Sequence, residues 1–422
     1  MAHKLQAVRG MNDLLPEQIG VWHRVEAVLR EVAWSYGYQE IRTPVIEKTE
    51  LFTQSIGDHS DIVQKEMYTF IDSGGENLAL RPEATASTVR ACNQHGLLHN
   101  QQRRLWYLGP MFRRERPQKG RYRQFHQFGI EAFGWPGPDI DAEVIRAAAG
   151  IWGRLGVEDV HLQVNTLGSP QAGAAYRRAL RAYFAQHRRC LDPDSLRRLE
   201  THPLRILDSK VAATREVVAG APDIRSFLDG PSRAHFDGLC ESLRHSGIQY
   251  RVNPHLVRGL DYYTATVFEW VTDQLGAQNA VCAGGRYDQL VEKRGGRPTP
   301  AVGFAIGIER LVELVRGQGG DAARPVTDVY VACADDQGRA EAVSVSEMLR
   351  RAGFAVTTHC GCGKLNKQMK RADQSGARVA VITGLVQTAE AVQAKPLRNQ
   401  GVEQRVSIDA LVDWCRTYTE RS

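Results

Sequence analysis

The 422-residue sequence predicts an α+β protein with two parts: a long region of paired strands that contains a helical segment, and a smaller α/β domain at the C-terminus. Three observations support this fold class. Strand-like runs on either side of a polar loop follow an amphipathic helix. The pattern then turns helical between about residues 171 and 250, and beyond residue 326 strands alternate with helices.

The composition is that of an ordinary globular protein. Hydrophobic residues make up 42% of the chain and charged residues 24%, which excludes a mainly disordered protein. Lys and Arg number 54 against 48 Asp and Glu, so the net charge is +6. This mild excess permits a polyanionic partner, but it matters only where basic residues cluster.

The cysteines and the N-terminus bear on the compartment. Eight cysteines are scattered along the chain and only Cys360 and Cys362 lie close together, which favours reduced thiols over a disulfide framework. His359 beside this pair could suggest a metal, but no second ligand pair follows, so we expect a plain loop. The first residues lack the apolar core of a signal peptide, and no apolar stretch is long enough to span a membrane. We therefore expect a cytoplasmic protein without a membrane partner.

The N-terminal elements follow from the spacing of apolar residues. Residues 18–36 have the period of an amphipathic helix, and a β-prone run comes after Gly37. One helical stretch and three strand-like pieces come next, at 84–94 and at 78–82, 104–115 and 122–133. The sequence PQKGR between the last two strands predicts a hairpin with a long loop.

The middle of the chain is helical from about 171 to 250. Between Gln171 and Arg205 there are eight Arg against three acidic residues. Such a run is consistent either with a solvated helical face or with contact to a polyanion.

Strand patterns return after this helical region, and a second domain follows. The strands are expected at 262–271 and 280–285, and residues 301–316 read as a strand running into a helix. The polar stretch GQGGDAARP indicates a linker, which we place at 321–326 between domains at 1–320 and 327–422. In the second domain we expect strands at 327–334, 354–359 and 377–384 and helices at 338–352, 364–375 and 407–418. Their alternation predicts a small, mostly parallel α/β domain with right-handed crossovers.

Polar residues on the strand at 122–133 point to a ligand. Side chains alternate along a strand, so Gln127, Gly129 and Glu131 share one face. Gln127 and Glu131 then stand about 13 Å apart at roughly 3.3 Å per residue, with Gly129 leaving room for a small ligand between them. The alternative is an exposed face with incidental polar groups.

A second polar cluster, Arg81-Pro82-Glu83-Ala84-Thr85, lies where a strand meets a helix. Glu83 and Thr85 could be an ordinary helix start, since both residue types favour the first turn. They could equally hold an ammonium group, because a carboxylate and a hydroxyl are good acceptors for one.

Three arginines lie next to glycine or at the ends of strands and helices. Arg113 enters the hairpin, Arg258 precedes Gly259, and Arg310 begins a helix whose amide end favours anions. Each alone is more often structural, but together they would form a polyphosphate clamp if they converge. Neither a Walker A sequence nor a Rossmann glycine motif is present, so a triphosphate would need an unusual sheet platform.

These residues carry a family resemblance. The helix and strand ending at Pro44, the hairpin with Arg113 and the strand and helix with Arg310 resemble motifs 1, 2 and 3 of class II aminoacyl-tRNA synthetases. The blocks LVRGLDYY and AGGRYD resemble two signatures peculiar to histidyl-tRNA synthetases, and RPQKGRYRQFHQ resembles their motif 2 loop. The resemblance runs from RGMNDLLP to ADQSGARVAV, which is nearly the whole chain.

The resemblance implies a fold and an activity. The fold would be a mainly antiparallel sheet flanked by helices, with a helical insertion near 171–250 and a C-terminal α/β anticodon-binding domain. The activity would be ligation of histidine to tRNA(His), with histidyl-adenylate as the intermediate and AMP and pyrophosphate as products. ATP would be a substrate, Mg²⁺ would accompany it through ligands that the sequence does not identify, and a homodimer would form through the motif 1 region.

The resemblance also implies residue roles. Arg113 and Arg258 would be catalytic at the α-phosphate of ATP, and Arg310 would also bind ATP. The residues implied for histidine are Glu83, Thr85 and Gln127 at its amino and carboxylate ends and Glu131, Tyr262, Tyr263 and Tyr287 around its imidazole ring. Arg116 and Gln118 would contact the acceptor end of the tRNA.

The sequence departs from the family in two places. Ala84 stands where bacterial relatives usually have glycine, and Cys360 and Cys362 interrupt a turn that is commonly glycine-rich. The nearby basic set could be a solvated helix face or could contact the anticodon arm, and it comprises Lys364, Lys367, Lys370 and Arg371.

Two other functions fit less well. A regulatory subunit of histidine biosynthesis typically lacks the block around Arg258 and the C-terminal domain, and both are present here. A class II synthetase for proline or threonine is disfavoured by Gln127 and Glu131 together with LVRGLDYY.

Overall fold

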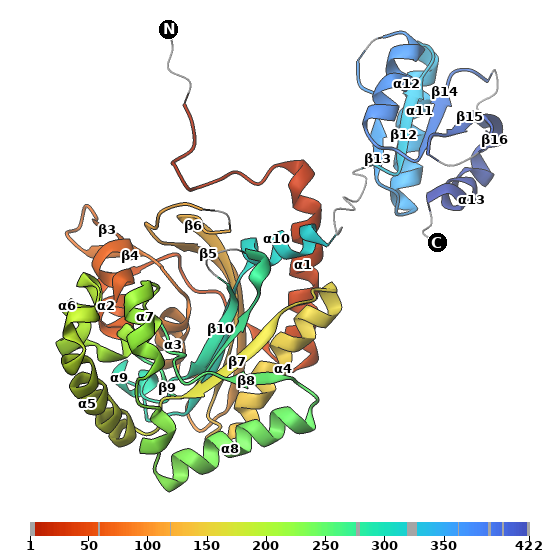
Figure 1. The fold of residues 1–422 in the computed structure, drawn as a ribbon. Helices are drawn as coiled ribbons and strands as arrows, with labels where there is room; N and C mark the ends of the chain where they lie inside the picture. Colours follow the sequence, from red (N-terminus) through yellow and green to blue (C-terminus); the bar gives the residue numbers. More distant parts are fainter. Residues whose placement is uncertain are drawn as a thin grey trace. The chain divides into compact units, whose positions relative to one another are not determined.

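A computed structural model describes residues 5–57, 60–118, 120–275, 279–318, 327–361, 363–386, 390–398 and 401–419. The chain forms two compact units, Met1–Ala322 and Ala323–Ser422 (Figure 1). The linker predicted at 321–326 lies outside the described residues. Of the helices that the structure describes, none has the length and apolar character needed to cross a membrane.

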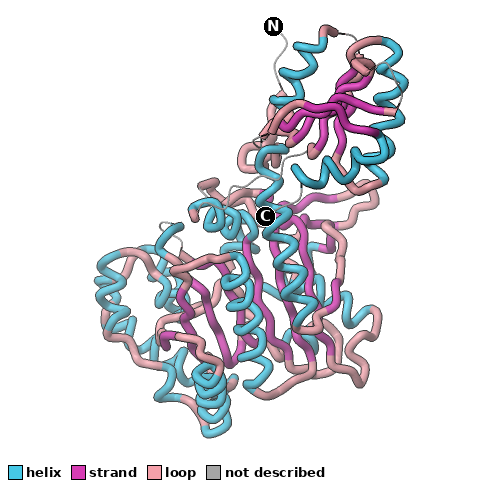
Figure 2. The backbone as a smooth tube through the Cα atoms, turned by 90° about the vertical axis from the view of Figure 1, so that its right-hand side faces the viewer, coloured by secondary structure: helices cyan, strands magenta, loops and turns pink. Residues whose placement is uncertain are grey.

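An eight-stranded sheet forms the centre of the first unit, and Figure 2 shows its strands side by side with helices around them. Its order is β1 (Gln39–Glu40), β5 (Arg103–Phe112), β6 (Gln124–Phe133), β11 (Ala301–Gly307), β10 (Ala280–Arg286), β9 (Thr264–Val271), β7 (His161–Thr166) and β8 (Tyr250–Val252). Only the outermost pairs, β1 with β5 and β7 with β8, are parallel. The predicted hairpin of β5 and β6 and the mainly antiparallel sheet are confirmed.

Helices cover one face of this sheet. They are α1 (Pro16–Ser35), α4 (Pro138–Leu155), α8 (Gly230–His245) and α10 (Ile308–Gly317). Helix α1 forms where the sequence predicts it, because Val21, Val25 and Leu29 repeat at helical spacing and bury one stripe. It ends before Gly37, whose φ of +75° suits a residue without a side chain.

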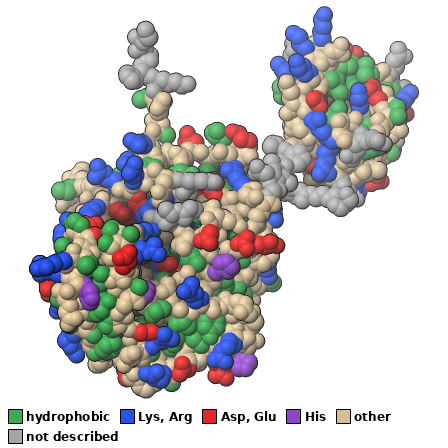
Figure 3. All heavy atoms as spheres, viewed as in Figure 1, with side chains coloured by type: hydrophobic (Ala, Val, Ile, Leu, Met, Phe, Trp, Pro, Cys, Tyr) green, Lys and Arg blue, Asp and Glu red, His purple; other side chains and the backbone are tan. Residues whose placement is uncertain are grey.

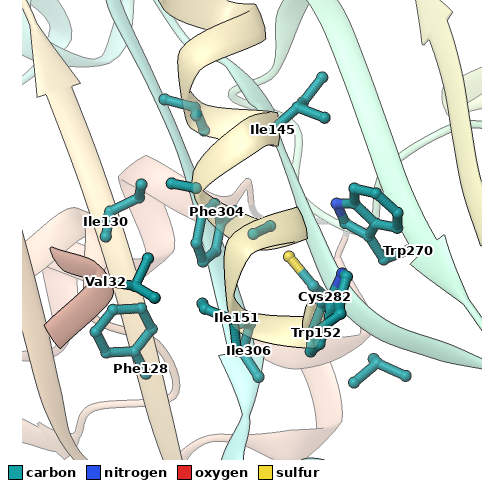
Figure 4. Packing of buried hydrophobic residues seen from close by; sticks show 14 of the residues in the cluster. Val32, Phe128, Ile130, Ile145, Ile151, Trp152, Trp270, Cys282, Phe304 and Ile306 are labelled. Carbon is teal, nitrogen blue, oxygen red and sulfur yellow. The ribbon is translucent and has the colours of Figure 1, made fainter. Parts of the chain in front are cut away.

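The core lies between these helices and the sheet. Figure 4 shows Phe128, Ile130 and Phe304 of the strands facing Ile151 and Trp152 of α4. Burying each such side chain stabilises the fold by about 1.5–3 kcal/mol. This packing holds the sheet on the face that the helices cover, and the opposite face is left for the site.

A three-stranded sheet lies beside the central one. It has the order β2 (Ile46–Lys48), β4 (Asn77–Leu80) and β3 (Tyr68–Ile71), and it packs with α2 (Thr49–Ile56), a π-helical turn Ile62–Glu66 and α3 (Thr85–Gln94). Helix α9 (Leu290–Lys293) contacts α3. The single β-prone run expected after Gly37 is therefore divided, with Pro44 between its two strands.

The helical region near 171–250 has two parts. Helices α5 (Pro170–Gln186), α6 (Pro193–Thr201) and α7 (Ala212–Ala219) share a small core of their own, built around Tyr176, Leu180 and Phe184. Helix α8 instead packs on α4 and places Phe236 and Leu239 in the main core.

The second unit is an α/β domain. Its sheet has the order β13 (Val356–Thr358), β12 (Val329–Cys333), β14 (Val379–Thr383), β15 (Ala391–Pro396) and β16 (Gln404–Ser407), and its helices are α11 (Asp336–Arg351), α12 (Leu365–Gln374) and α13 (Ile408–Thr419). The three predicted strands are parallel, but β15 and β16 were missed and are antiparallel. The connection from Thr383 to Ala391 is too short for a crossover, so β15 must reverse direction.

Candidate active site

A cavity of about 300 Å³ lies on the face of the central sheet opposite α1 and α4. Ten of the twelve predicted site residues line it, namely Glu83, Thr85, Arg113, Gln127, Glu131, Arg258, Tyr262, Tyr263, Tyr287 and Arg310. The other two, Arg116 and Gln118, are exposed on the β5–β6 loop outside it. Residues as far apart in the sequence as Glu83 and Arg310 thus meet at one place.

Small residues form the floor of the cavity. Gly303, Ala305 and Gly307 of β11 and Ala283 of β10 line it, and they share the face of Gln127 and Glu131. A Cβ atom on Gly303 would overlap the Glu131 carboxylate and the carbonyl of Ile130. Glycine is required there because the Glu131 side chain lies flat across β11.

The space above Gly129 is not left for a ligand, as the sequence suggested. A Cβ atom there would overlap the ring and hydroxyl of Tyr107, which is the partner of Gly129 on β5. The expected open face is therefore partly filled by a neighbouring strand's side chain.

Glu131 is buried and accepts two hydroxyl hydrogen bonds. Thr85 Oγ1 donates to its Oε1 at 2.7 Å, and the Tyr287 hydroxyl donates to its Oε2. Burial raises the pKa of Glu131 to about 8, although both hydroxyls oppose that shift. Such a carboxylate responds strongly to a cationic or hydrogen-bonding ligand.

Glu83 lies two residues before the first residue of helix α3 and binds the N–H groups of its first turn. Its carboxylate accepts the backbone N–H groups of Thr85 at 2.7 Å and of Ala86 at 2.9 Å, so the helix-start interpretation is correct. The same carboxylate lines the cavity, and burial raises its pKa. The methyl group of Ala84 does not line the cavity but packs against Tyr107 and Met111.

The three arginines converge on the cavity. Arg113 is held by a 2.8 Å bond from its Nε to the Pro82 carbonyl, and its guanidinium lies 5.4 Å from the Phe125 ring. Arg310 donates to the carbonyls of Gly120 and Ala280. Burial, and then Arg113, lowers the pKa of Arg310, which indicates cations close together.

Arg258 is paired with a buried acid. It donates to Glu269 of β9, and its guanidinium stands 5.6 Å from the Tyr263 ring. Burial works to lower the pKa of Arg258, but the Glu269 carboxylate holds it above its ordinary value. A cluster of permanent cations in a walled cavity favours a polyanion such as a triphosphate.

Comparisons with known proteins agree with this geometry. A family model described as histidyl-tRNA synthetase matches residues 10–311, and one described as anticodon binding domain matches residues 328–418. The chain belongs to the histidyl-tRNA synthetase family. Its first unit therefore has the class II synthetase fold, its second unit is an anticodon-binding domain, and it is a histidine–tRNA ligase that uses ATP as a substrate.

Solved structures support the assignment. The apo histidyl-tRNA synthetase of S. aureus is 33% identical, with 99% of this chain and 100% of that chain covered and a TM-score of 0.82. The histidyl-tRNA synthetase from Nostoc sp. is 21% identical over 98% of this chain and 99% of its own, with a TM-score of 0.71. An ATP phosphoribosyltransferase regulatory subunit/histidyl-tRNA synthetase from Bacillus halodurans is 24% identical over 88% and 97%, with a TM-score of 0.65. The last two show the fold alone.

The motif 2 loop of this synthetase contributes residues that the sequence reasoning missed. Glu115 is buried at the cavity wall and pairs with Arg121, while Gln118 and Arg121 bridge the loop through their backbones. Phe125 lines the same wall. A lone acid within a basic run is the signal that would have identified Glu115.

Glu269 was also missed. It is the single acid in the apolar strand TATVFEWV, which is a readable signal because a buried acid requires a partner. Conversely, Arg286 of the AGGRYD signature does not face the cavity. It is buried on Asp141 of α4 and donates to the carbonyls of Trp135 and Gly137, so it anchors the segment that carries Tyr287.

The surface of the catalytic unit is mixed in charge. Figure 3 shows basic, acidic and apolar side chains interspersed on the face in view. The mild positive excess of the composition therefore does not gather into one uniform patch on this face.

Proposed function

We propose that the cavity binds histidine and ATP side by side and that its arginines promote formation of histidyl-adenylate. The observation that carries this is the mixed lining of one cavity. It holds both Glu131, whose carboxylate accepts two hydroxyl hydrogen bonds, and the three cations Arg113, Arg258 and Arg310.

In the proposed histidine subsite, Glu131, Tyr262, Tyr263 and Tyr287 surround the imidazole ring. Tyr262, Tyr263 and Tyr287 pack with ring centroids 4.7–6.5 Å apart, which makes a firm aromatic wall with hydroxyl groups. A site built to pair buried donors and acceptors rejects analogues that lack them by about 10⁴ to 10⁵.

The other end of histidine would be held by Glu83, Thr85 and Gln127. An ammonium group has three donors and no acceptor, which suits the buried carboxylate of Glu83. Gln127 Oε1 is buried and has no hydrogen-bond partner among the described residues, so it is available to a ligand.

The first step would be attack of the histidine carboxylate on the α-phosphate of ATP, with pyrophosphate leaving. The protein supplies no nucleophile. Arg113 and Arg258 would neutralise charge that develops on the α-phosphate, and Arg310 would hold the departing phosphates. The ribose hydroxyl at the tRNA end would then attack the adenylate carbonyl, transferring histidine and releasing AMP.

Mg²⁺ would enter with ATP. Across the described residues, the structure has no cluster of three or more His, Cys, Asp or Glu side chains that could hold a metal. Two acids beside the arginines, Glu115 and Glu269, are already engaged by Arg121 and Arg258. We therefore assign the charge neutralisation that the protein itself provides to arginine.

The tRNA would meet the enzyme at both units. The exposed residues Arg116 and Gln118 lie on the loop at the cavity mouth, where they would contact the acceptor end. Lys364 and Lys367, at the start of α12, would contact the backbone of the anticodon arm.

The enzyme would act in the cytoplasm as a homodimer. In the motif 1 region, Trp34 is 80% exposed and Ile46 is 45% exposed, which leaves apolar surface for a second copy. Sedimentation of the purified protein at about twice its monomer mass would support the dimer, and a monomer would contradict it.

The test of the proposed mechanism is histidine-dependent exchange of pyrophosphate into ATP. Purified protein should catalyse exchange with histidine and not with proline or threonine. Exchange with another amino acid, or none at all, would overturn the proposal.

A further inference from the structure

The segment that carries Arg258 is in contact with the helical insertion. Val257 packs against the small core shared by α5, α6 and α7. Two residues further on, the Gly259 carbonyl accepts a hydrogen bond from Arg205 of the insertion, and Arg205 Nη2 also donates to Asp261 Oδ1 at 3.4 Å. Every second residue of the stretch 257–261 therefore meets the insertion.

The residues between these contacts line the active-site cavity. Arg258 and Leu260 belong to its lining, and Tyr262 follows them there. The guanidinium end of Arg258 is held by Glu269, but its backbone lies between two residues that meet the insertion. A shift of that backbone would therefore move Arg258 relative to the phosphate that it is proposed to bind.

Arg205 reaches this segment from a firm base. It lies in the 3₁₀ turn Pro203–Asp208, whose Ile206 and Leu207 are buried in the core of the insertion. Figure 1 shows the helices of that core, α5, α6 and α7, grouped at one side of the catalytic unit. The planar fork of an arginine offers several donors in a rigid arrangement, which suits two acceptors on one loop.

Asp261 is confined on its other side by the end of α2. Its backbone N–H donates to the Ile56 carbonyl at 3.1 Å, and a Cβ atom on Gly57 would overlap its carboxylate. His202 of the insertion lies 3.5 Å from the second carboxylate oxygen. The segment is therefore held between the catalytic unit and the insertion, with Arg205 as a contact on the insertion side.

Side-chain packing does not fill the space beside this contact. A cavity of about 370 Å³ lies between the insertion and the segment, with Tyr176 and Arg177 of α5 among its lining on one side and Tyr263 and Thr264 on the other. Because close packing is interrupted there, the hydrogen bonds of Arg205 have a larger part in fixing the backbone around Arg258.

We propose that Arg205 is a positioning residue for adenylation, which holds Arg258 in place by binding the backbone and the carboxylate of its loop. The inference rests on the proposed function, because it takes Arg258 to act at the α-phosphate. Arg205 is not among the described residues that line the active-site cavity, so its effect passes through Arg258. The insertion thereby takes part in the first step of the reaction, before tRNA is bound.

The experiment is histidine-dependent pyrophosphate exchange at saturating histidine and ATP, with full-length wild-type protein, Arg205→Ala and a control. Arg205→Ala should slow exchange by about 10- to 100-fold, the range expected when a catalytic group is misplaced by about 1 Å or less. Saturating substrate removes any effect on binding alone.

Arg198→Ala is the matched control. Arg198 also belongs to the insertion, on α6, and its Nη2 also binds an acid outside the insertion, Asp61 at 3.0 Å. Among the described residues, no hydrogen bond or ion pair joins Arg198 or Asp61 to residues 257–261. Its exchange rate should equal that of the wild type.

A double-mutant cycle separates positioning from a general structural role. Arg205→Ala is also placed in the Arg258→Ala protein, where no arginine is left to position. The double variant should then exchange at the rate of Arg258→Ala alone, because residues that act as a unit are not additive. An equal loss in both backgrounds, or wild-type exchange by Arg205→Ala, overturns the inference.

Arg205→Lys keeps the test decisive if thermal unfolding shows that Arg205→Ala does not fold. Lysine retains the charge but not the fork, so exchange should fall roughly threefold in the wild-type background and not at all in Arg258→Ala. Equal effects in the two backgrounds again overturn the inference.

Failure of the proposed function has a different outcome. Wild-type protein without histidine-dependent exchange would remove the proposed function itself. Wild-type exchange with an unaffected Arg205→Ala variant would remove only the role of Arg205.

Discussion

The two faces of the central sheet are built from the same strands and differ in almost every property. On β6, Phe128 and Ile130 point to the helices and are completely or almost completely buried, whereas Gln127 and Glu131 point to the cavity. On β11, Phe304 faces the core while Gly303 and Ala305 form the cavity floor. One residue of displacement along a strand separates the core from the site.

The difference shows how the fold maintains a polar site. The apolar face provides the free energy of folding, because large side chains there leave water together. The cavity face lowers the free energy of unfolding, since it buries carboxylates, arginines and hydroxyls that are only partly paired. Predictions that affect one face should therefore leave the other largely intact.

The largest expected effect is on the apolar face. Phe304→Ala should lower the free energy of unfolding by about 3–5 kcal/mol, because it removes a buried ring and leaves a cavity between β11 and the helices. Urea unfolding measures this, with Ile306→Val as a control expected to lose about 0.5–1.5 kcal/mol. The Kd of the folded protein for histidine should not change, and a raised Kd would show that the faces are coupled.

On the cavity face, Arg258→Ala should slow histidine-dependent pyrophosphate exchange by about 10² to 10³, the effect of removing one preorganised donor to developing charge. Histidine binding should survive, because Arg258 is assigned to the phosphate end. Exchange kinetics and calorimetry measure the two properties. The exchange rate of Arg258→Lys, which keeps the charge without the planar fork, should lie between those of the wild type and Arg258→Ala. Unchanged adenylation by Arg258→Ala would refute the assigned role.

Gly303→Ala tests the cavity face by adding a single methyl group to its floor. The new Cβ atom overlaps the Glu131 carboxylate, so the KM for histidine should rise about tenfold, as expected for overpacking of about 1–3 kcal/mol. Gly307→Ala is the matched control on the same face of the same strand, since its nearest neighbour would be Arg310 Cδ at 3.8 Å. Equal behaviour of the two variants would contradict the tight floor under Glu131.

The last comparison concerns the pH dependence of stability, which is small over any one pH unit. Burial raises the pKa of Glu131 to about 8 in the folded protein, so between its ordinary pKa and pH 8 the folded state binds a proton that the unfolded state has lost. Stability should therefore fall across this window by up to about 1.4 kcal/mol per pH unit from this group. Glu131→Gln should remove that dependence. Urea unfolding without histidine at pH 5.5, 6.5, 7.5 and 8.5 measures it, and a constant difference from wild type would contradict the raised pKa.

Much of the fold was readable because its elements have strong local signals. Helix α1 and the β5–β6 hairpin were predicted from periodicity and a polar loop, and both are present. Strands β15 and β16 were missed because polar residues interrupt their apolar patterns, Gln393 and Lys395 in β15 and Gln404 and Arg405 in β16. Helix α4 was also not predicted, although its apolar period is clear and Pro138 and Gly156 mark its ends.

The site was readable to the extent that its residues lie in short motifs. Glu83, Arg113 and Arg258 could be proposed from their neighbours in sequence, and all three line the cavity. Glu269 could be recognised as a buried acid that needs a partner, but its pairing with Arg258 could not, because that contact depends on the tertiary fold. Arg286 lies within a signature motif, yet its side chain leaves the site for Asp141.

The sequence alone determined the local patterns. These are the alternation that separates Gln127 and Glu131 from the core, and the placement of arginines beside glycine. Only the tertiary structure decided which of these meet. Pairing of β6 with β11 joins strands far apart in the sequence and sets Glu131 over Gly303, while the loop before β9 brings Arg258 against Glu269. Local patterns fix the direction of a side chain, whereas contact between distant segments depends on sheet order and register, which are chosen by packing of the whole core.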